Sequence, residues 1–366
     1  MRYYLIAGEA SGDLHGGILM KALAEKDPQA RFRFRGGDSM LEAGGELFRH
    51  YKDTAVMGIT EVAAKAGRIL ADMAATKEDI AEWKPDVLIL IDYPGFNLRM
   101  ARFAHGKGFK VFYYIPPKLW ARGERRIAKV RKYVDEVFVI FPFEVEYFKS
   151  RGVNAHYFGN PLAAQTGSPS VDRKVIALLP GSRQAELKWL MPRFVEMEQR
   201  MAADPRWAQY RLVIAAAPNM TAKDFAAWLP ADSRIEVRFG KAAELFAESR
   251  SAVISSGTAS LEAALAGVPQ VVCYGFSRIT WLIAKHTVKV KFISLANLIV
   301  DKLIFKELIQ DDSSVGNILS ELERLTFDEE YRAEMQQGYD ELRTILSNGN
   351  AASGIAGCIF ELLKDQ

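Results

Sequence analysis

A chain of 366 residues is long enough for two domains, each with its own core. Hydrophobic residues make up 49% and charged residues 25%, which is typical of a globular protein and excludes a disordered or fibrous one. A formal net charge of +3 is too small to indicate a nucleic-acid partner, and two cysteines offer no metal cluster and fit a reducing compartment.

The N-terminal segment predicts a first strand at residues 3–7. The apolar run ends at Gly8 without a processing site, so we expect a cytoplasmic protein rather than a secreted one. No run approaches the roughly 18 apolar residues of a membrane span, so any membrane contact is expected to be peripheral. The glycines at 8, 12, 16 and 17 do not have the GxGxxG spacing of a dinucleotide-binding site. Glu9, Ser11 and Asp13 either contact a ligand at the strand's carboxyl end or cap the following helix.

Short apolar runs recur between helical patterns, at 87–91, 110–115, 136–140 and 154–158. Such strands, alternating with helices, predict a parallel sheet covered on both faces, so the first domain is doubly wound. Asp92 directly follows the run at 87–91. It is either a general base whose pKa is raised by partial burial or an Asp that hydrogen-bonds the turn at Pro94 and Gly95.

Residues 56–75 carry apolar side chains at helical spacing, which usually indicates a face packed in the core. The alternative is a hydrophobic lip for acyl chains, because Met57 and Ile59 follow a loop and basic residues occupy the opposite face.

Residues 118–132 hold seven basic residues, among them Arg122 and Arg125, against one acid. A charge run is normally a solvated helix face. The near absence of acids and the nearby Trp120 favour contact with anionic lipid or phosphate. RNA is not favoured, because no aromatic residues are interleaved to stack bases.

A polar linker at 167–170 separates a second domain, and strands are predicted at 175–179, 211–216, 234–238, 252–255 and 270–274. We therefore expect an N-terminal domain at 1–168, a second parallel-sheet domain at 169–345, and a last helix at 346–366. That helix packs back on the first domain or is exchanged with another chain.

Two loops of the second domain have the composition of anion-binding turns. Ser182 and Arg183 precede one helix, and Ser256, Gly257 and Thr258 open another. Backbone N–H groups at a helix start attract phosphate, and Arg adds a bidentate donor. Ordinary helix capping is the alternative. Two such loops in one domain favour a diphosphate, and Glu262, one turn into its helix, could accept hydrogen bonds from a ribose.

Six ordered blocks resemble the lipid-A-disaccharide synthase family, and the resemblance spans nearly the whole chain: AGEASGD (7–13), AVMGITEV (55–62), PDVLILIDYPGFN (85–97), LLPGSR (178–183), SSGTASLE (255–262) and SLANL (294–298). The resemblance implies an inverting glycosyltransferase of the glycosyltransferase-B type, with two Rossmann-like domains facing a cleft. It implies transfer of 2,3-diacylglucosamine from its UDP derivative to the 6-hydroxyl of 2,3-diacylglucosamine 1-phosphate (lipid X), giving a β-1,6 disaccharide and UDP.

The resemblance also implies roles for particular residues. Asp92 matches the catalytic carboxylate and Arg183 an essential arginine. The positions it matches around UDP are Ser256, Gly257, Thr258, Glu262, Asn297 and Gln310. From the loop, the apolar segment and the basic run described above, we add Ser182 to the UDP contacts and expect Glu9, Ser11, Met57, Ile59, Arg122 and Arg125 on the acceptor or lipid side.

Two positions depart from the family pattern. Gly95 stands where a second acid is usual, and IPPKLWARG at 115–123 replaces a block with Ser and two Trp.

No cofactor is expected, and the sequence lacks an Asp-x-Asp triplet that would hold a metal against a diphosphate. The family implies a peripheral protein on the cytoplasmic face of the inner membrane of a Gram-negative bacterium, and monomer and homodimer stay open. Two rivals remain: another enzyme of this fold, such as a nucleotide-sugar epimerase or a transferase with a soluble acceptor, and a non-catalytic membrane-surface protein that binds UDP-sugar.

Overall fold

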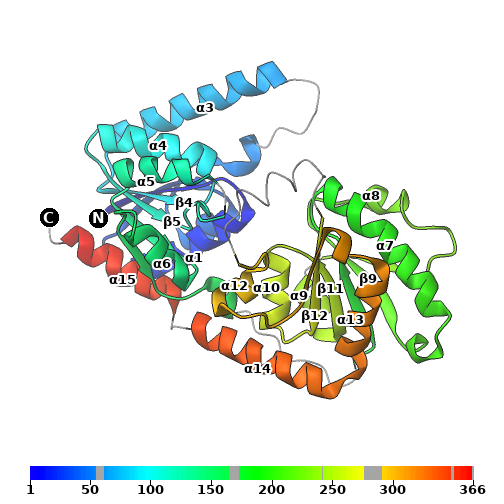
Figure 1. Cartoon of the computed structure of the whole chain (residues 1–366). Helices are drawn as coiled ribbons and strands as arrows, with labels where there is room; N and C mark the ends of the chain where they lie inside the picture. The colour runs from blue at the N-terminus through cyan, green and yellow to red at the C-terminus, as the bar shows by residue number, and fades with distance from the viewer. Residues whose placement is uncertain are drawn as a thin grey trace. The chain divides into compact units, whose positions relative to one another are not determined.

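The chain folds into two compact units, each built on a parallel sheet (Figure 1). The computed structural model describes residues 1–54, 62–121, 123–164, 173–240, 242–275, 291–347 and 350–364. The first unit comprises Met1–Pro161 and Asn348–Gln366, and the second comprises Leu162–Ser347. The predicted boundary at 168 lies outside the described residues. No described helix is long and apolar enough to cross a bilayer.

The first unit has a seven-stranded sheet in the order β3-β2-β1-β4-β5-β6-β7, with every pair parallel. The strands are β1 (Arg2–Ala7), β2 (Arg31–Gly36), β3 (Glu46–His50), β4 (Val87–Ile91), β5 (Lys110–Tyr114), β6 (Glu136–Val139) and β7 (Ala155–Tyr157). The helices are α1 (Ala10–Lys26), α2 (Asp38–Ala43), α3 (Val62–Trp83), α4 (Pro94–Gly106), α5 (Ile127–Tyr133), α6 (Pro142–Lys149) and α15 (Ala351–Lys364).

Successive residues of the central strands point to opposite faces and enter two separate cores. Tyr4 and Leu90 pack with α3 to α6 in one core, and Leu5 and Ile89 pack with α1, α2 and α15 in the other. Continuous apolar strands follow from this burial on both faces. The predicted doubly wound fold of this unit is confirmed.

Strands β2 and β3 are absent from the sequence prediction. In β2, Arg alternates with Phe, which is not the pattern of a buried strand, yet Arg35 is only 1% exposed. The arginines bind acidic residues of α3: Arg35 Nη1 lies 2.6 Å from Asp72 Oδ2, and Arg33 binds Asp79 through Nε and Nη2. Paired charges therefore replace apolar contacts where α3 crosses this edge of the sheet.

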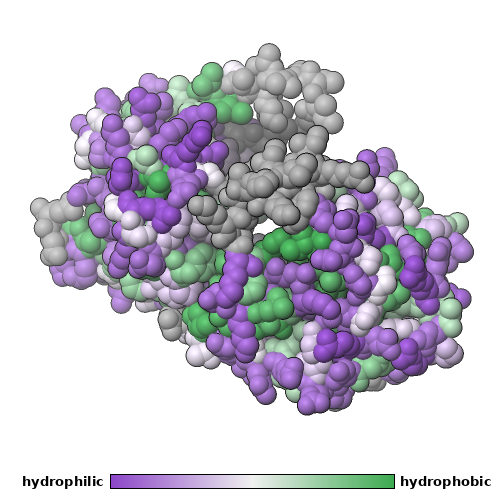
Figure 2. All heavy atoms as spheres, in the orientation of Figure 1, coloured by the Kyte–Doolittle hydropathy of each residue, from purple (hydrophilic) through white to green (hydrophobic). Residues whose placement is uncertain are grey.

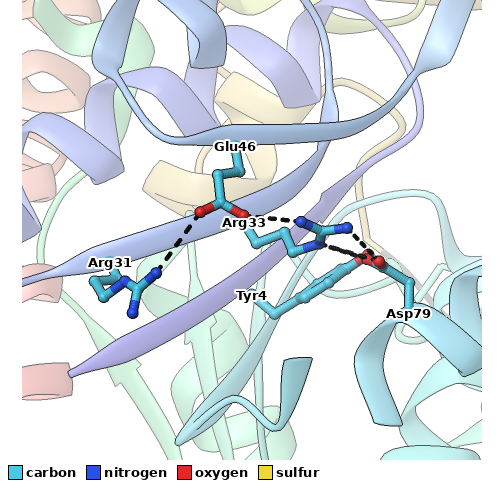
Figure 3. Close-up of polar contacts among 5 residues, drawn as sticks. All are labelled: Tyr4, Arg31, Arg33, Glu46 and Asp79. Atoms are coloured by element: carbon cyan, nitrogen blue, oxygen red, sulfur yellow. Dashed lines mark hydrogen bonds and ion pairs between the residues drawn. The ribbon is translucent and has the colours of Figure 1, made fainter. Parts of the chain in front are cut away.

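Asp79 is the centre of a polar cluster that joins β1, β2 and α3 (Figure 3). The Tyr4 hydroxyl donates to Asp79 Oδ2 at 2.7 Å, and Arg33 reaches across to Glu46 of β3 at 2.8 Å. Arg31 completes the cluster on the far side of Glu46, at 3.8 Å. This cluster fixes the position of α3 on the sheet.

The second unit has a six-stranded parallel sheet in the order β10-β9-β8-β11-β12-β13. The strands are β8 (Val175–Leu179), β9 (Arg211–Ala216), β10 (Glu236–Phe239), β11 (Ser249–Ser255), β12 (Gln270–Tyr274) and β13 (Glu307–Ile309). The helices are α7 (Gln184–Ala202), α8 (Ala222–Ala226), α9 (Ala242–Glu248), α10 (Thr258–Leu265), α12 (Leu295–Val300), α13 (Val315–Phe327) and α14 (Glu329–Leu346). The fold prediction of two parallel-sheet α/β units is confirmed, although β13 was not predicted.

The last helix, α15, belongs to the first unit (Figure 1). Its Ile355 and Ile359 are fully buried in the core that also contains α1. Gly354 allows this approach, because a Cβ there would lie 2.7 Å from the ring of Phe158.

Candidate functional site

Asp92 lies at the carboxyl end of the central strand β4, half-buried. Its backbone has a φ of 45° and that of Tyr93 a φ of 48°, which are strained for residues with side chains. The carbonyl oxygen of Asp92 accepts hydrogen bonds from Asn97 Nδ2 at 2.7 Å and from the Tyr113 hydroxyl at 2.8 Å. Two buried side chains thus hold a strained turn that carries this carboxylate.

Burial raises the pKa of Asp92, and the nearby negative charge of Glu9 raises it further. A hydrogen bond from the Tyr93 amide and the positive charge of Lys118 act in the opposite direction. A carboxylate with a raised pKa is a stronger base, so this environment suits proton abstraction from a hydroxyl.

The loop after β1 contributes residues of two kinds. Glu9 precedes α1, and its Oε1 accepts a hydrogen bond from Ser11 Oγ at 3.1 Å, with both residues exposed. Asp13, by contrast, is 3% exposed and accepts hydrogen bonds from the backbone amides of Gly37, Ser39 and Met40. Asp13 therefore holds the start of α2 and is not a ligand contact.

The sequence analysis did not identify Glu144, which lies at the start of α6. This helix follows β6, and β6 is separated from β4 in the sheet by β5. Glu144 is 1% exposed and accepts hydrogen bonds from Trp120 Nε1 at 2.9 Å and the Phe141 amide at 3.1 Å. Burial raises the pKa of Glu144 to about 7. The Lys118 side chain is exposed, with Nζ 5.4 Å from the Phe141 ring. Partial loss of solvation beside the protein lowers its pKa, and the negative charges of Glu144 and Asp92 act in the opposite direction. The position of Lys118 in a basic run did not indicate that it lies near these two carboxylates.

In the second unit, the first predicted anion loop is already occupied by a carboxylate of the protein. Glu186 Oε2 accepts hydrogen bonds from the amides of Ser182 at 2.8 Å and Arg183 at 3.1 Å. Gly181 makes room for it, since a Cβ there would lie 2.2 Å from Glu186 Oε2. These two amides are therefore not free for phosphate. The Arg183 side chain stays 74% exposed, with Nη1 2.9 Å from Glu186 Oε1.

The second predicted anion loop, at the start of α10, is open. Gly257 and Thr258 are exposed, and a Cβ built on Gly257 would meet no described residue within 4 Å apart from its neighbours in the chain. Ser256 is half-buried beside the Ile293 carbonyl. Glu262 is also half-buried, burial raises its pKa, and it makes no hydrogen bond or ion pair with any described residue. An open helix start beside an unpartnered acceptor suits a phosphate and a sugar hydroxyl.

Asn297 and Gln310, the other two predicted UDP contacts, lie outside this helix start. Asn297 is fully buried and its amide is engaged within the protein: Nδ2 donates to Glu307 Oε1 at 2.9 Å, and Oδ1 accepts from the Ile304 amide at 2.9 Å. It therefore holds α12 against the segment before β13. Gln310 directly follows β13 with a φ of 55° and is half-buried.

Of the predicted lipid-facing residues, Arg125 lies in the short 3-10 helix Glu124–Arg126 before α5 and is exposed. Met57, Ile59 and Arg122 lie outside the described residues. Among the residues that the structure describes, no cluster of His, Cys, Asp and Glu is arranged to hold a metal ion.

Solved structures share the fold at low sequence identity. The UDP-GlcNAc 2-epimerase from Neisseria meningitidis bound to UDP-GlcNAc is 13% identical, with a TM-score of 0.67 over 100% of both chains. The calicheamicin glycosyltransferase is 16% identical, with a TM-score of 0.61 over 100% of this chain and 98% of that one. At this identity the likeness concerns the fold alone.

Sequence relatives are much more similar. The lipid-A-disaccharide synthase of Myxococcus xanthus is 36% identical, with 99% of this chain and 97% of that protein aligned. The enzyme of the same name from Coxiella burnetii strain CbuK_Q154 is 34% identical over 98% of both. The family model described as Lipid-A-disaccharide synthetase matches residues 3–353. On this match the chain belongs to the lipid-A-disaccharide synthase family of UDP-sugar glycosyltransferases.

Proposed function

We propose that the chain transfers 2,3-diacylglucosamine from UDP-2,3-diacylglucosamine to the 6-hydroxyl of 2,3-diacylglucosamine 1-phosphate, with inversion at the anomeric carbon. Family membership supports the reaction. The observation that carries the mechanism is the half-buried Asp92 at the end of β4, whose pKa is raised.

Asp92 takes the proton of the acceptor 6-hydroxyl. The oxygen attacks the anomeric carbon as the bond from that carbon to the diphosphate breaks, and UDP leaves with the bonding electron pair. The product is a β-1,6 disaccharide 1-phosphate. A base on the hydroxyl and donors at the diphosphate are the two catalytic requirements of this transfer.

The second unit is proposed to bind UDP. Amides at the start of α10 (Ser256 to Thr258) and the exposed Arg183 guanidinium stabilise the negative charge on the leaving diphosphate, because helix starts and guanidinium groups favour oxyanions. Glu262 accepts hydrogen bonds from the ribose. Asn297 acts indirectly by holding α12, and Ser182 and Gln310 line the nucleotide.

The first unit is proposed to bind the acceptor, with Glu9 and Ser11 beside Asp92. Arg125, with Met57, Ile59 and Arg122, meets the lipid side. We also propose peripheral association with the cytoplasmic face of the inner membrane, as a monomer or a homodimer.

Product analysis tests the reaction. The full chain is incubated with both acylated sugars, with and without a chelator, and products are identified by mass spectrometry. We expect the disaccharide 1-phosphate and UDP in both samples. Epimerised UDP-sugar, transfer to a non-acylated acceptor, or binding without UDP release would each support a rival function.

Asp92→Asn tests the base. Because the amide cannot take a proton, turnover should fall by about 10²- to 10⁴-fold. UDP affinity, measured by calorimetry, should hardly change, since UDP is proposed to bind the other unit. Full activity in this variant would remove Asp92 from the mechanism.

A further inference from the structure

A groove of about 760 Å³ lies on the first unit, lined by residues of α3, α4 and the segment that includes α5. Helix α4 contacts both α3 and α5, and Figure 1 shows the three helices gathered on one side of the unit. The volume is that of a typical small-ligand site. The proposed mechanism gives this groove no role, although Met73 of the segment 56–75 and Arg126 and Lys129 of the basic run line it.

The charge of the groove is entirely positive among the described residues that line it. Six cations contribute, and no carboxylate does: Lys77, Arg99, Arg102, Lys107, Arg126 and Lys129. None of the six forms an ion pair with any residue that the structure describes, whereas Arg33, Arg35 and Arg151 of the same unit are all paired. Six like charges around one hollow without counter-charges indicate an anionic ligand.

The remaining lining is largely apolar. Met73 and Leu98 are core residues, and the rings of Phe103 and Tyr133 pack against that core. One turn before Met73, the α3 side chain of Leu70 is 64% exposed, so the apolar surface continues out of the groove along α3. Figure 2 shows hydrophobic atoms over this helix within a mostly hydrophilic face. The ligand should therefore carry acyl chains as well as negative charge.

One end of the groove is formed by residues close in sequence to the proposed base. Pro94 and Gly95, which line it, follow Asp92 by two and three residues. The Arg99 side chain folds back so that Nη1 donates to the Gly95 carbonyl at 3.1 Å. An anion bound at Arg99 would therefore lie near the first turn of α4, the helix that directly follows the turn carrying Asp92.

We propose that this groove binds the phosphomonoester of the acylated sugar acceptor. Arg99 and Arg102 bind the phosphate, and an acyl chain lies over Met73, Phe103 and Leu70. The inference rests on the proposed function, and it names the part of the protein that selects a phosphorylated acceptor.

The test compares two acceptors in detergent micelles: 2,3-diacylglucosamine 1-phosphate and the same lipid without phosphate. The groove variant is Arg99→Gln/Arg102→Gln. The matched control is Lys21→Gln/Lys149→Gln, which removes two exposed charges of the same unit outside the groove. Circular dichroism checks the fold of each. Binding of each acceptor without donor is measured by calorimetry.

For the groove variant, we expect KM and Kd for the phosphorylated acceptor to rise at least about 10-fold. The reason is that the variant loses the charge-assisted hydrogen bonds from two guanidinium groups to the phosphate. The values for the non-phosphorylated acceptor, and kcat, should stay close to those of the wild type, as should all values for the control. The inference is wrong if KM and Kd change equally for both acceptors, or if they do not change for either.

Two further outcomes are distinguishable. If the variant keeps its acceptor preference but no longer sediments with phosphatidylglycerol vesicles, the groove meets bilayer lipid and the inference is wrong. If the wild-type protein transfers to neither acceptor, the proposed function fails. Loss of phosphate-dependent binding in the variant would then still support the groove.

Discussion

At the scale of single residues, the environment of Asp92 decides what its carboxylate can do. The sequence left two roles open, a base or a turn-forming residue. In the structure Asn97 and Tyr113 bind the Asp92 carbonyl oxygen, and the Tyr93 amide donates to the carboxylate. The carboxylate itself stays half-buried, with its pKa raised.

The pH dependence of the reaction should follow the charges around Asp92. A raised pKa keeps the proton on the carboxyl to higher pH, so activity should fall as the pH drops through a value above the usual pKa of about 3.9. Glu9→Gln removes a like charge and should move this acid limb to lower pH. Lys118→Met removes an opposite charge and should move it to higher pH. Profiles of kcat/KM against pH measure both, and shifts in the same direction would contradict the assignment.

Glu262 gives a residue-scale prediction in the second unit. Because its carboxylate has no partner among the described residues, Glu262→Ala should leave the fold intact and weaken UDP binding about 10- to 150-fold, the loss of one charged hydrogen bond. Calorimetry with UDP measures the loss. Glu341→Ala, an exposed change on α14, is the control. Unchanged UDP affinity in the Glu262 variant would exclude the ribose contact.

At the scale of elements, helix α3 depends on charged contacts rather than on apolar burial alone. Asp72 and Asp79, seven residues apart and so on one side of the helix, bind Arg35 and Arg33 of β2. The same helix contributes Met73 and Lys77 to the cationic groove. The polar cluster at β2 therefore also positions one wall of the groove.

Asp79→Ala should destabilise the first unit. It leaves Arg33 without its buried partner and the Tyr4 hydroxyl without an acceptor, at a cost of about 2–5 kcal/mol in the free energy of unfolding. Urea denaturation measures this. Glu46→Ala removes the half-exposed partner of Arg33 and should cost no more than about 1 kcal/mol. If both variants lost the same free energy of unfolding, the buried contacts of Asp79 would not be more stabilising than the exposed contact of Glu46.

At the scale of the whole molecule, the last helix connects the end of the chain to the first unit. Ile355 and Ile359 of α15 are buried with residues of α1 and the sheet. The sequence could not decide between this packing and exchange with another chain, because an apolar helix face fits either.

Ile359→Ala should lower the free energy of unfolding by about 2–5 kcal/mol, since it opens a cavity in a fully buried site. If α15 packs on its own chain, the melting temperature of the wild type should not depend on protein concentration. Calorimetry over a wide concentration range measures this. A melting temperature that rises with concentration would favour the exchanged dimer.

The sequence by itself determined the two parallel-sheet units and the family, because continuous apolar strands and ordered motif blocks are local patterns. It also placed Asp92 at a strand end. Only the tertiary structure decided that Asp13, Glu186 and Asn297 are held in internal contacts, and that β2 exists. The reason is physical: a buried charge or amide is recognised by its partners, such as Asp79 for Arg33, and these lie far away in sequence. The cationic groove likewise could not be predicted from the sequence, because its unpaired cations come from separate segments that are brought together only in the folded unit.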